Sequence, residues 1–181
     1  MLGTLDTVPA LQRTDLLAAP VAAALTGPWG ADVLVAEIDP ALADTAAFCE
    51  RYDVALDVSA NCVIVAGRRG AETKYAACVV LATTRADVNG VVRRRLDARK
   101  ASFAPVDATV EQTAMEYGGI TPFGLPVGWP VLVDAAVAAT AHVVVGSGLR
   151  RSKLVVPGSA LADVPGAEVV EGLATPVPAG G

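Results

Sequence analysis

Three glycines and one proline fall within the nine residues from Glu116 to Gly124, Glu-Tyr-Gly-Gly-Ile-Thr-Pro-Phe-Gly. A loop of this composition exposes backbone N–H groups at fixed angles, and such groups bind phosphates, oxyanions or ester carbonyls without a charged side chain. A second glycine turn, Gly146 to Lys153, brings Arg150, Arg151 and Lys153 to a chain reversal. Two glycine loops beside a basic cluster predict a pocket for a small polar group on an anionic carrier.

The side chains that most enzymes use for catalysis are largely missing from the chain. His142 is the only histidine, so a metal site with two histidines is impossible, and neither an H-x-x-E-H nor a G-x-S-x-G motif occurs. Asp134 follows a predicted strand and is more typical of a helix cap than of an acid catalyst. We expect no metal and no cofactor, so the chemistry would rest on backbone dipoles, a water molecule and groups of the substrate.

Composition indicates one globular domain. The chain has 181 residues, of which 53% are hydrophobic and 18% charged, which is enough for one full core and short for two. The three cysteines, Cys49, Cys62 and Cys78, form no C-x-x-C pair and each lies in an apolar run. Buried thiols in a reducing compartment are therefore a better interpretation than a reactive cysteine.

The apolar segment 16–25 is not expected to be a secretory signal. Such a signal needs a basic start, whereas Asp6 and Asp15 outnumber the single Arg13 before it. No apolar run reaches the roughly 20 residues that span a bilayer. The sequence thus predicts a cytoplasmic protein that has no membrane partner.

The net charge is −5, but most basic residues fall between 68 and 153. One cluster comprises Arg93, Arg94, Arg95, Arg99 and Lys100, on and after a predicted helix. It is compatible with a solvated helix face and with contact to a nucleic-acid backbone. The acidic total argues against strong nonspecific binding of nucleic acid, DNA included.

Strands and helices alternate along the chain. We expect strands at 33–38, 61–66, 75–82, 102–104, 131–133, 142–145 and 154–156. We expect helices at 14–25, 41–52, 87–96 and from Asp107 or Thr109 to 115, with one helical turn at 159–162. Thr14 and Asp39 are the predicted N-caps of the first two helices. Gly67 to Gly70 is the predicted turn of a hairpin, and 116–130 is a long loop stiffened by prolines. This order indicates a mixed α/β sheet.

Five segments in this order resemble one known family. They are Glu37-Ile38-Asp39-Pro40, Asn61-Cys62-Val63-Ile64-Val65, Ala101-Ser102-Phe103-Ala104, Gly118-Gly119-Ile120-Thr121-Pro122-Phe123-Gly124 and the turn from Gly146 to Arg150. The sequence over 33–162 resembles the YbaK family of aminoacyl-tRNA deacylases, whose domain also occurs as the editing insertion of bacterial prolyl-tRNA synthetases. The Gly-Gly-Ile-Thr-Pro loop is the most specific part of the match.

The resemblance implies a single α/β domain with a partly barrel-like mixed sheet flanked by helices. It places this domain at 31–172, after an N-terminal helical extension at 1–30 and before a disordered tail at 173–181. It also implies hydrolysis of amino acids from mischarged tRNA, with tRNA as one partner and a synthetase as a second candidate. In the family, the glycine-to-proline loop lines the pocket for the aminoacyl ester.

Site residues follow from the same resemblance together with the two glycine loops. The loop backbone that would hold the ester carbonyl and its oxyanion comprises Gly118, Gly119, Ile120 and Thr121. The expected substrate-binding residues are Asn61, Pro122, Gly146, Ser147, Gly148 and Lys153. The expected tRNA-binding residues are Arg93, Arg94, Arg95, Arg99, Lys100, Arg150 and Arg151.

Two positions depart from the family pattern. Asn61 stands where the family usually has a lysine thought to contact the tRNA end, and Lys153 stands where members such as YbaK carry an aspartate. If the two positions line one pocket, Lys153 can restore from the opposite wall the positive charge that Asn61 removes. Strand alternation allows this, because Lys153 can face away from the apolar Leu154.

Three functions remain open from the sequence. The first is a trans-acting editing deacylase for a small amino acid, because a synthetase pocket separates amino acids that differ by one methylene only about 10- to 200-fold. The second is a noncatalytic module that binds tRNA or an aminoacyl nucleotide, which Asn61 favours. The third is a small-metabolite binding protein unrelated to tRNA.

Overall fold

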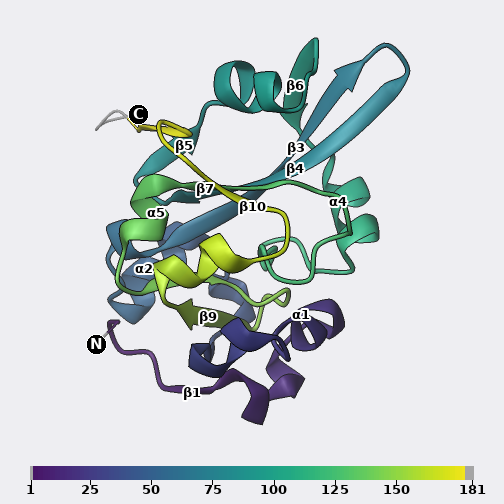
Figure 1. Ribbon diagram of the computed structural model, residues 1–181. Coiled ribbons are helices and arrows are strands. Elements are labelled where there is room, and N and C mark those ends of the chain that lie inside the picture. Colours follow the sequence, from purple (N-terminus) through teal and green to yellow (C-terminus); the bar gives the residue numbers. More distant parts are fainter. Residues whose placement is uncertain (1, 178–181) are drawn as a thin grey trace.

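The computed structural model describes residues 2–177, which form three β-sheets with short helices packed around them (Figure 1). The strands are β1 (Thr7–Pro9), β2 (Leu34–Glu37), β3 (Ala60–Arg69), β4 (Glu72–Leu81), β5 (Thr84–Ala86), β6 (Lys100–Phe103), β7 (Val131–Asp134), β8 (Val143–Gly146), β9 (Ser152–Val156), β10 (Ala167–Val170) and β11 (Ala174–Pro176). The α-helices are α1 (Ala19–Ala24), α2 (Thr45–Tyr52), α3 (Arg93–Arg95), α4 (Val106–Thr113) and α5 (Ala135–Ala139).

The largest sheet is mixed. Its strand order is β10-β7-β4-β3-β6, with β10, β7 and β4 parallel and β3 antiparallel to both of its neighbours. A second sheet, β1-β2-β9-β8, is antiparallel throughout, and β5 pairs with β11 in a third. A bridge between Ser59 and Val144 links the ends of the two larger sheets. The predicted mixed α/β fold class is confirmed.

Small apolar side chains form the core, as the composition predicts. The main cluster lies between the two larger sheets and is made mostly of valine, leucine and alanine. A second cluster covers the other face of β3 and β4 beneath the segment 86–98, and a third lies between α2 and the sheet of β8 and β9. Within residues 2–177, no helix has the length and apolar character needed to cross a bilayer.

The N-terminal segment differs from the predicted helix at 14–25. Thr14–Leu16 forms a 3₁₀ turn, Leu17 is extended, and α1 begins only at Ala19, with Pro20 in its first turn. Proline is favoured there because the first helical N–H groups have no intrahelical partner. Strand β1 also pairs with β2, so residues 1–30 are not purely helical. Side chains of this segment, Leu16 and Leu25 among them, are buried in the main core.

The hairpin turn lies later in the chain than predicted. Strand β3 continues to Arg69, and the reversal occurs at Gly70 and Ala71. Gly67 lies within the strand, paired with Lys74. It is glycine because a Cβ there would lie 2.9 Å from side-chain atoms of Leu96 and Ala98. The glycine therefore marks a close approach of two elements and not a turn.

The predicted helix at 41–52 is divided in two. The Asp39 carboxylate accepts a hydrogen bond from the N–H of Ala41 at 2.9 Å and caps a 3₁₀ turn, Pro40–Leu42. Helix α2 then starts separately at Thr45. The break frees the carbonyl oxygen of Ala43 from a helical hydrogen bond, and this oxygen becomes part of the site described below.

The later helices begin partly where the sequence predicts. Asp87 accepts hydrogen bonds from the N–H groups of Gly90 and Val91, which caps a π-helix, Val88–Val92, that continues into α3. Helix α4 begins at Val106 directly after Pro105, so neither Asp107 nor Thr109 is its N-cap. The expected helical turn at 159–162 is a 3₁₀ helix, Gly158–Asp163.

The predicted disordered tail at 173–181 is wrong for its first part. Leu173 is fully buried, and β11 pairs with β5. One carboxylate oxygen of Asp134 accepts the N–H of Ala174 at 3.0 Å, while the other caps α5 through the N–H of Ala136 at 3.0 Å. Asp134 is thus the helix cap that the sequence predicts, and it also anchors β11. Residues 178–181 lie outside the described part of the chain.

Candidate functional site

The two glycine loops pack against each other through their backbones. A Cβ on Gly146 would lie 2.3 Å from the carbonyl oxygen of Gly119 and 2.5 Å from that of Ile120. The N–H of Gly148 donates to the Gly119 oxygen at 2.7 Å, and the N–H of Glu116 donates to the Gly148 oxygen at 2.8 Å. Only glycine allows main chains to approach so closely, which explains this residue at position 146.

Gly119 holds the loop together instead of facing a ligand. Its N–H donates to the carbonyl oxygen of Glu116 at 3.0 Å, and a Cβ on it would lie 2.6 Å from the backbone oxygen of Leu149. The expectation that this N–H contacts the ester carbonyl is therefore wrong. Within residues 2–177, the N–H groups of Gly118 and Ile120 donate to no recorded acceptor. Gly118 has a φ of +88°, which glycine adopts without strain.

A cavity of about 220 Å³ opens beside these loops. It brings together five of the residues predicted from the sequence: Asn61, Gly118, Ile120, Gly146 and Lys153. The remaining lining residues are Ala43, Asp44, Thr45, Ala60, Cys62, Val63 and Tyr117. We call this the glycine-loop cavity.

Lys153 supplies a buried positive charge to the glycine-loop cavity. It lies on β9 opposite Ala36 of β2 and Gly146 of β8, and its residue surface is 8% exposed. Its Nζ donates to the carbonyl oxygen of Ala43 at 2.9 Å and lies 5.3 Å from the centre of the Phe48 ring. Leu154 faces the main core on the other side of the strand, as alternation requires.

Burial changes the acid–base behaviour of this lysine. Removal from water lowers the pKa of Lys153 from 10.5 to about 8, an effect opposed by Cys49 and Asp44 and increased by Arg150. No carboxylate of the described residues lies within ion-pair distance of Nζ. The ammonium is therefore the principal cation inside the cavity at neutral pH.

Asn61, on β3, contributes a neutral polar group to the same cavity. Its Oδ1 accepts a hydrogen bond from the Oγ1 of Thr45 at 2.6 Å, so the first residue of α2 fixes the amide. The structure thus places Asn61 and Lys153 at one cavity, with the charge on β9 and none on β3.

Arg150 links the glycine loop to the segment before α2 at the rim of the cavity. Its backbone N–H donates to the carboxylate of Glu116 at 2.6 Å, and its guanidinium donates to the carbonyl oxygens of Tyr117 at 3.1 Å and Pro40 at 3.2 Å. Asp44 lies 3.9 Å from the same guanidinium. These contacts tie the glycine loop to the segment before α2, and the binding of a tRNA phosphate by Arg150 stays a prediction.

Several other predicted residues lie away from the cavity. Arg151 donates to the backbone oxygen of Asp15. Ser147 is fully buried, and its hydroxyl bonds to that of Ser152 at 2.7 Å. A Cβ on Gly148 would meet Ala18, on the side of α1. Thr121 is fully buried, and its Oγ1 has no hydrogen-bond partner within the described chain.

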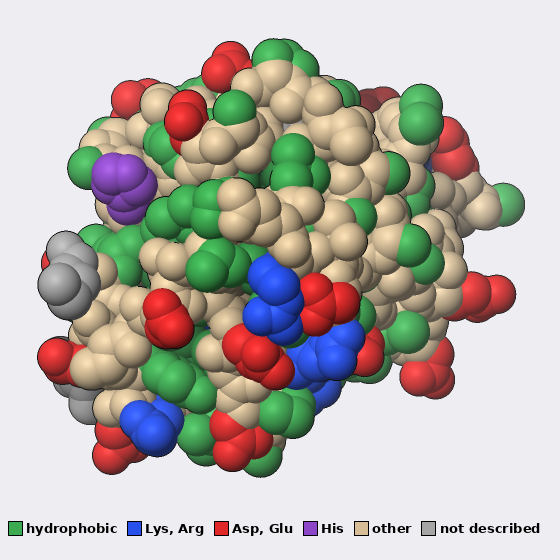
Figure 2. Space-filling model, turned by 90° about the horizontal axis from the view of Figure 1, so that it is seen from below, with side chains coloured by type: hydrophobic (Ala, Val, Ile, Leu, Met, Phe, Trp, Pro, Cys, Tyr) green, Lys and Arg blue, Asp and Glu red, His purple; other side chains and the backbone are tan. Residues whose placement is uncertain are grey.

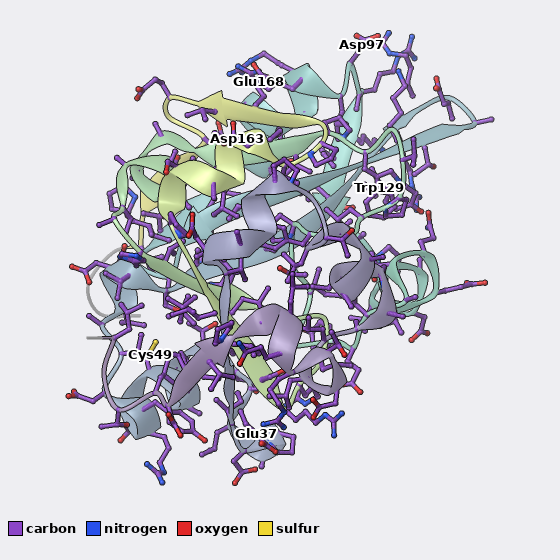
Figure 3. The ribbon with its side chains drawn as sticks, turned by 60° about the horizontal axis from the view of Figure 1, so that its bottom comes forward. Glu37, Cys49, Asp97, Trp129, Asp163 and Glu168 are labelled. Carbon is purple, nitrogen blue, oxygen red and sulfur yellow. The ribbon has the colours of Figure 1, made fainter. Side chains whose placement is uncertain are left out.

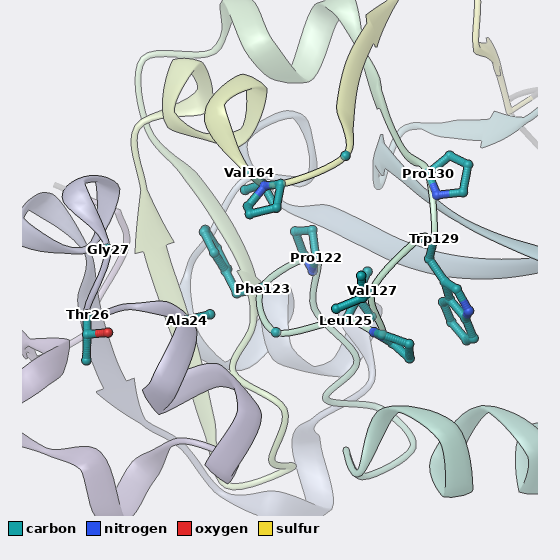
Figure 4. A pocket seen from close by; sticks show the side chains of 15 residues that line it. Ala24, Thr26, Gly27, Pro122, Phe123, Leu125, Val127, Trp129, Pro130 and Val164 are labelled. Atoms are coloured by element: carbon teal, nitrogen blue, oxygen red, sulfur yellow. The ribbon is translucent and has the colours of Figure 1, made fainter.

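Pro122 lines a second and larger cleft of about 760 Å³ (Figure 4). This cleft lies between Ala24, at the end of α1, and Trp129, which stacks on Tyr75 with ring centres 5.0 Å apart. Its walls are apolar, with prolines, Phe123 and Val164 prominent among them. The long loop therefore lines two different sites, the glycine-loop cavity through Ile120 and the apolar cleft from Pro122 onward.

The basic cluster at 93–100 lies at the other end of the molecule. Strand β3 runs from Asn61 at the cavity to Arg68, which pairs with Lys100, and seven strand residues span about 23 Å. Figure 3 shows Asp97 and Glu168, the partners of Arg69 and Arg95, far from Cys49, which lies near Lys153. Arg93 donates to the backbone oxygen of Asn89 at 2.7 Å. Arg94, Arg99 and Lys100 are exposed, without a recorded side-chain partner in the described chain.

Thiols and the single histidine do not add reactive groups to the cavity. Burial raises the pKa of Cys49, Cys62 and Cys78, so these thiols are protonated at neutral pH. His142 is exposed. Figure 2 shows it on one side of a face on which basic and acidic side chains are interspersed. The part of the chain that the structure describes contains no group of three metal-ligating side chains.

Sequence reasoning missed seven lining residues: Ala43, Asp44, Thr45, Ala60, Cys62, Val63 and Tyr117. The first three were hidden within the undivided helix predicted at 41–52. Asp44 followed by Thr45 is a typical helix start, and it could have revealed the break before α2. Tyr117 directly precedes the two glycines, and nothing in its type distinguishes it from a surface loop residue.

Comparisons with known proteins relate the chain to a family and to solved structures of the same fold. The sequence model of the aminoacyl-tRNA editing domain family matches residues 39–164. A search of curated proteins gives no match. A solved structure of a protein proposed to be a trans-editing enzyme for prolyl tRNA synthetase superposes with a TM-score of 0.71 at 19% identity, over 85% of this chain and 94% of the other.

Two further solved structures share the fold. A scaffold protein used for computational epitope grafting has a TM-score of 0.72 at 19% identity, with 85% of this chain and 95% of that one covered. The hypothetical protein APE2540 has a TM-score of 0.68 at 20% identity, with 78% and 90% covered. Because the family match spans more than half of the sequence and includes both glycine loops, the chain belongs to the aminoacyl-tRNA editing domain family.

Proposed function

We propose that the chain is a trans-acting deacylase that hydrolyses a small amino acid from mischarged tRNA. The observation that carries the proposal is the glycine-loop cavity, which is lined by Gly118, Ile120 and the buried Lys153. The N–H groups of Gly118 and Ile120 have no acceptor within the described chain and are available to a ligand. An ester carbonyl that becomes negatively charged during hydrolysis is stabilised by donors of this kind.

Cavity size supports a small acyl group. A volume of about 220 Å³ equals that of about seven water molecules at roughly 30 Å³ each. The glycyl, alanyl and seryl groups fit within that volume. Apolar residues, Cys62 and Ile120 among them, form part of the lining, against which a short side chain can pack.

The reaction needs little from side chains. A water oxygen attacks the ester carbonyl carbon, the bond from that carbon to the ribose oxygen breaks, and the ribose oxygen takes a proton. An aminoacyl ester is already activated and has a neighbouring ribose hydroxyl, so positioning supplies much of the rate. In this chain Lys153 and the loop N–H groups would hold the developing oxyanion, and Arg150 would keep the loop in place.

A noncatalytic module of the same fold is the second candidate. It is favoured by Asn61, whose carbonyl oxygen is occupied by Thr45 and which carries no charge. A module of this kind would bind an aminoacyl nucleotide or the tRNA end without hydrolysing it.

Deacylation of a panel of mischarged tRNAs separates the two candidates. The purified protein is expected to release glycine, alanine or serine from at least one tRNA faster than spontaneous hydrolysis, because the cavity accepts these acyl groups. The measurement is the loss of radiolabelled amino acid from the tRNA over time. Binding to the same tRNAs without turnover above the spontaneous rate would refute the deacylase and favour the noncatalytic module.

Salt dependence tests the role of the exposed basic residues in tRNA binding. Replacing Arg94, Arg99 and Lys100 together with alanine is expected to reduce the slope of log affinity against log salt by about 2, because each lost phosphate contact removes about 0.7 to 0.9. The cluster lies roughly 23 Å from the cavity. A single nucleic-acid strand covers that distance with on the order of seven nucleotides at about 3.4 Å each. The measurement is fluorescence anisotropy with uncharged tRNA at several salt concentrations.

The matched control is Arg13→Ala. This arginine is ion-paired with Asp15 at 2.9 Å and Glu37 at 3.4 Å, so its loss should leave the slope unchanged. An unaltered slope in the triple variant would assign the cluster to a solvated surface.

A further inference from the structure

The ammonium group of Lys153 has more binding capacity than the folded chain uses. It carries three donors. Within the described chain it donates one hydrogen bond, to the Ala43 oxygen at 2.9 Å. The residue is 8% exposed, so water can reach little of it. Buried charges are normally paired, which indicates that a ligand of this cavity supplies negative charge.

Neighbouring groups do not provide that charge. Asp44, before α2, has a side chain that is 75% exposed, and it lies 3.9 Å from the guanidinium of Arg150. Cys49, on α2, is a thiol whose pKa is raised by burial, so it is neutral at neutral pH. Arg150, before β9, adds a second positive charge. Among the described lining residues, the cavity has a cation in its interior and a single acid, Asp44, at its rim.

Ester hydrolysis produces an anion in this setting. The acyl group of the substrate is neutral at its carbonyl, whereas the released amino acid carries a full negative charge on two oxygens. The ammonium can donate to an oxygen of either group, but only the carboxylate adds the attraction between two full charges, which is strengthened where water is excluded. The product therefore gains an interaction with Lys153 that the ester lacks.

We propose that the glycine-loop cavity binds a free small α-amino acid, with its carboxylate on the Lys153 ammonium, and that this product inhibits the next turnover. The inhibition rests on the proposed function, whereas the binding can be measured without turnover. A ligand of alanine's size fits the volume of about 220 Å³.

Calorimetric titration with alanine and alaninamide tests the binding. The two compounds have the same size and the same α-ammonium, and they differ in the carboxylate. Wild-type protein is expected to bind alanine at least about 10-fold more tightly, as befits a charge-assisted contact. Lys153→Met should abolish this preference, and Lys153→Arg, which keeps the charge, should retain much of it. Circular dichroism checks that both variants are folded.

Equal affinity for the acid and the amide in the wild type would overturn the inference. So would a preference for alanine that survives in folded Lys153→Met. If that variant does not fold, propionate and propionamide are compared on the wild type at rising pH, because neither has an ammonium. The acid should lose its advantage as Lys153 loses its proton, above the pKa of about 8, and an advantage unchanged to high pH would overturn the inference.

The two proposals fail separately. Selective binding of alanine through Lys153 without any deacylation would leave the binding intact and refute the proposed function. Deacylation without selective binding would do the reverse. If both hold, free alanine but not alaninamide should slow deacylation.

Discussion

Lys153→Met is expected to lower kcat/KM for deacylation by about 100-fold or more, the usual cost of removing one oxyanion donor. Methionine keeps much of the length of the side chain and removes its charge. The measurement is single-turnover deacylation of the best substrate from the tRNA panel. The matched control is Lys74→Met, because Lys74 is exposed on β4 beside Glu72 at 3.8 Å. Equal activity of Lys153→Met and wild type would remove this lysine from the mechanism.

The same substitution should stabilise the fold. Burial lowers the pKa of Lys153 from 10.5 to about 8, so between these values the unfolded chain holds a proton that the folded chain lacks. The free energy of unfolding of the wild type should therefore rise with pH across this window, by about 3 kcal/mol at about 1.4 kcal/mol per pKa unit. Below about pH 8 the cost of the buried charge is fully present. Urea unfolding of both proteins at pH 7 and pH 10 measures the difference, which should shrink at the higher pH.

Gly146→Ala is expected to lower activity by about 100-fold through displacement of the loop, since a shift of about 1 Å at a reacting group has an effect of that size. The added Cβ would lie 2.3 Å and 2.5 Å from two main-chain oxygens, of Gly119 and Ile120, which have no flexible end to move aside. Overpacking of this kind also costs about 1 to 3 kcal/mol of stability. Deacylation rates and thermal melting measure the two effects.

Gly70→Ala is the matched control for this variant. Gly70 lies in the hairpin turn with a φ of +62°, and a Cβ there would meet nothing within 4 Å. The change should cost about 1 to 2 kcal/mol of backbone strain and leave deacylation intact. Wild-type activity in Gly146→Ala would show that the approach of the two loops does not position the donors.

Sequence patterns predicted the elements better than their ends. Apolar runs identified β2, β7, β8 and β9, because a buried strand must be apolar whatever it pairs with. Local chemistry also predicted the cap at Asp134. The turn at 67–70 was wrong because glycine serves both turns and close packing, and only the distant Leu96 and Ala98 decide between these uses.

The candidate site was predictable in its composition and not in its contacts. Both glycine loops follow from residue types. Strand alternation predicts that Lys153 and its neighbour Leu154 point to opposite faces of the sheet. The role of Arg150 depends on carbonyl oxygens as far away in the chain as Pro40, and no local pattern records such a pairing. Likewise, the pairing of β11 with β5 depends on Asp134, which is 40 residues from Ala174.

The residues that hold the two glycine loops together are not the same as all the residues that line the cavity. Main-chain contacts of Gly119 with Gly146 and Gly148, together with the hydrogen bonds of Glu116 and Arg150, hold the loops in place. Cys62 and Val63 of β3 also line the cavity, and neither takes part in the contact between the loops. Under the proposed function, substitutions at these two positions can therefore change the preferred acyl group while the contact between the two glycine loops is kept.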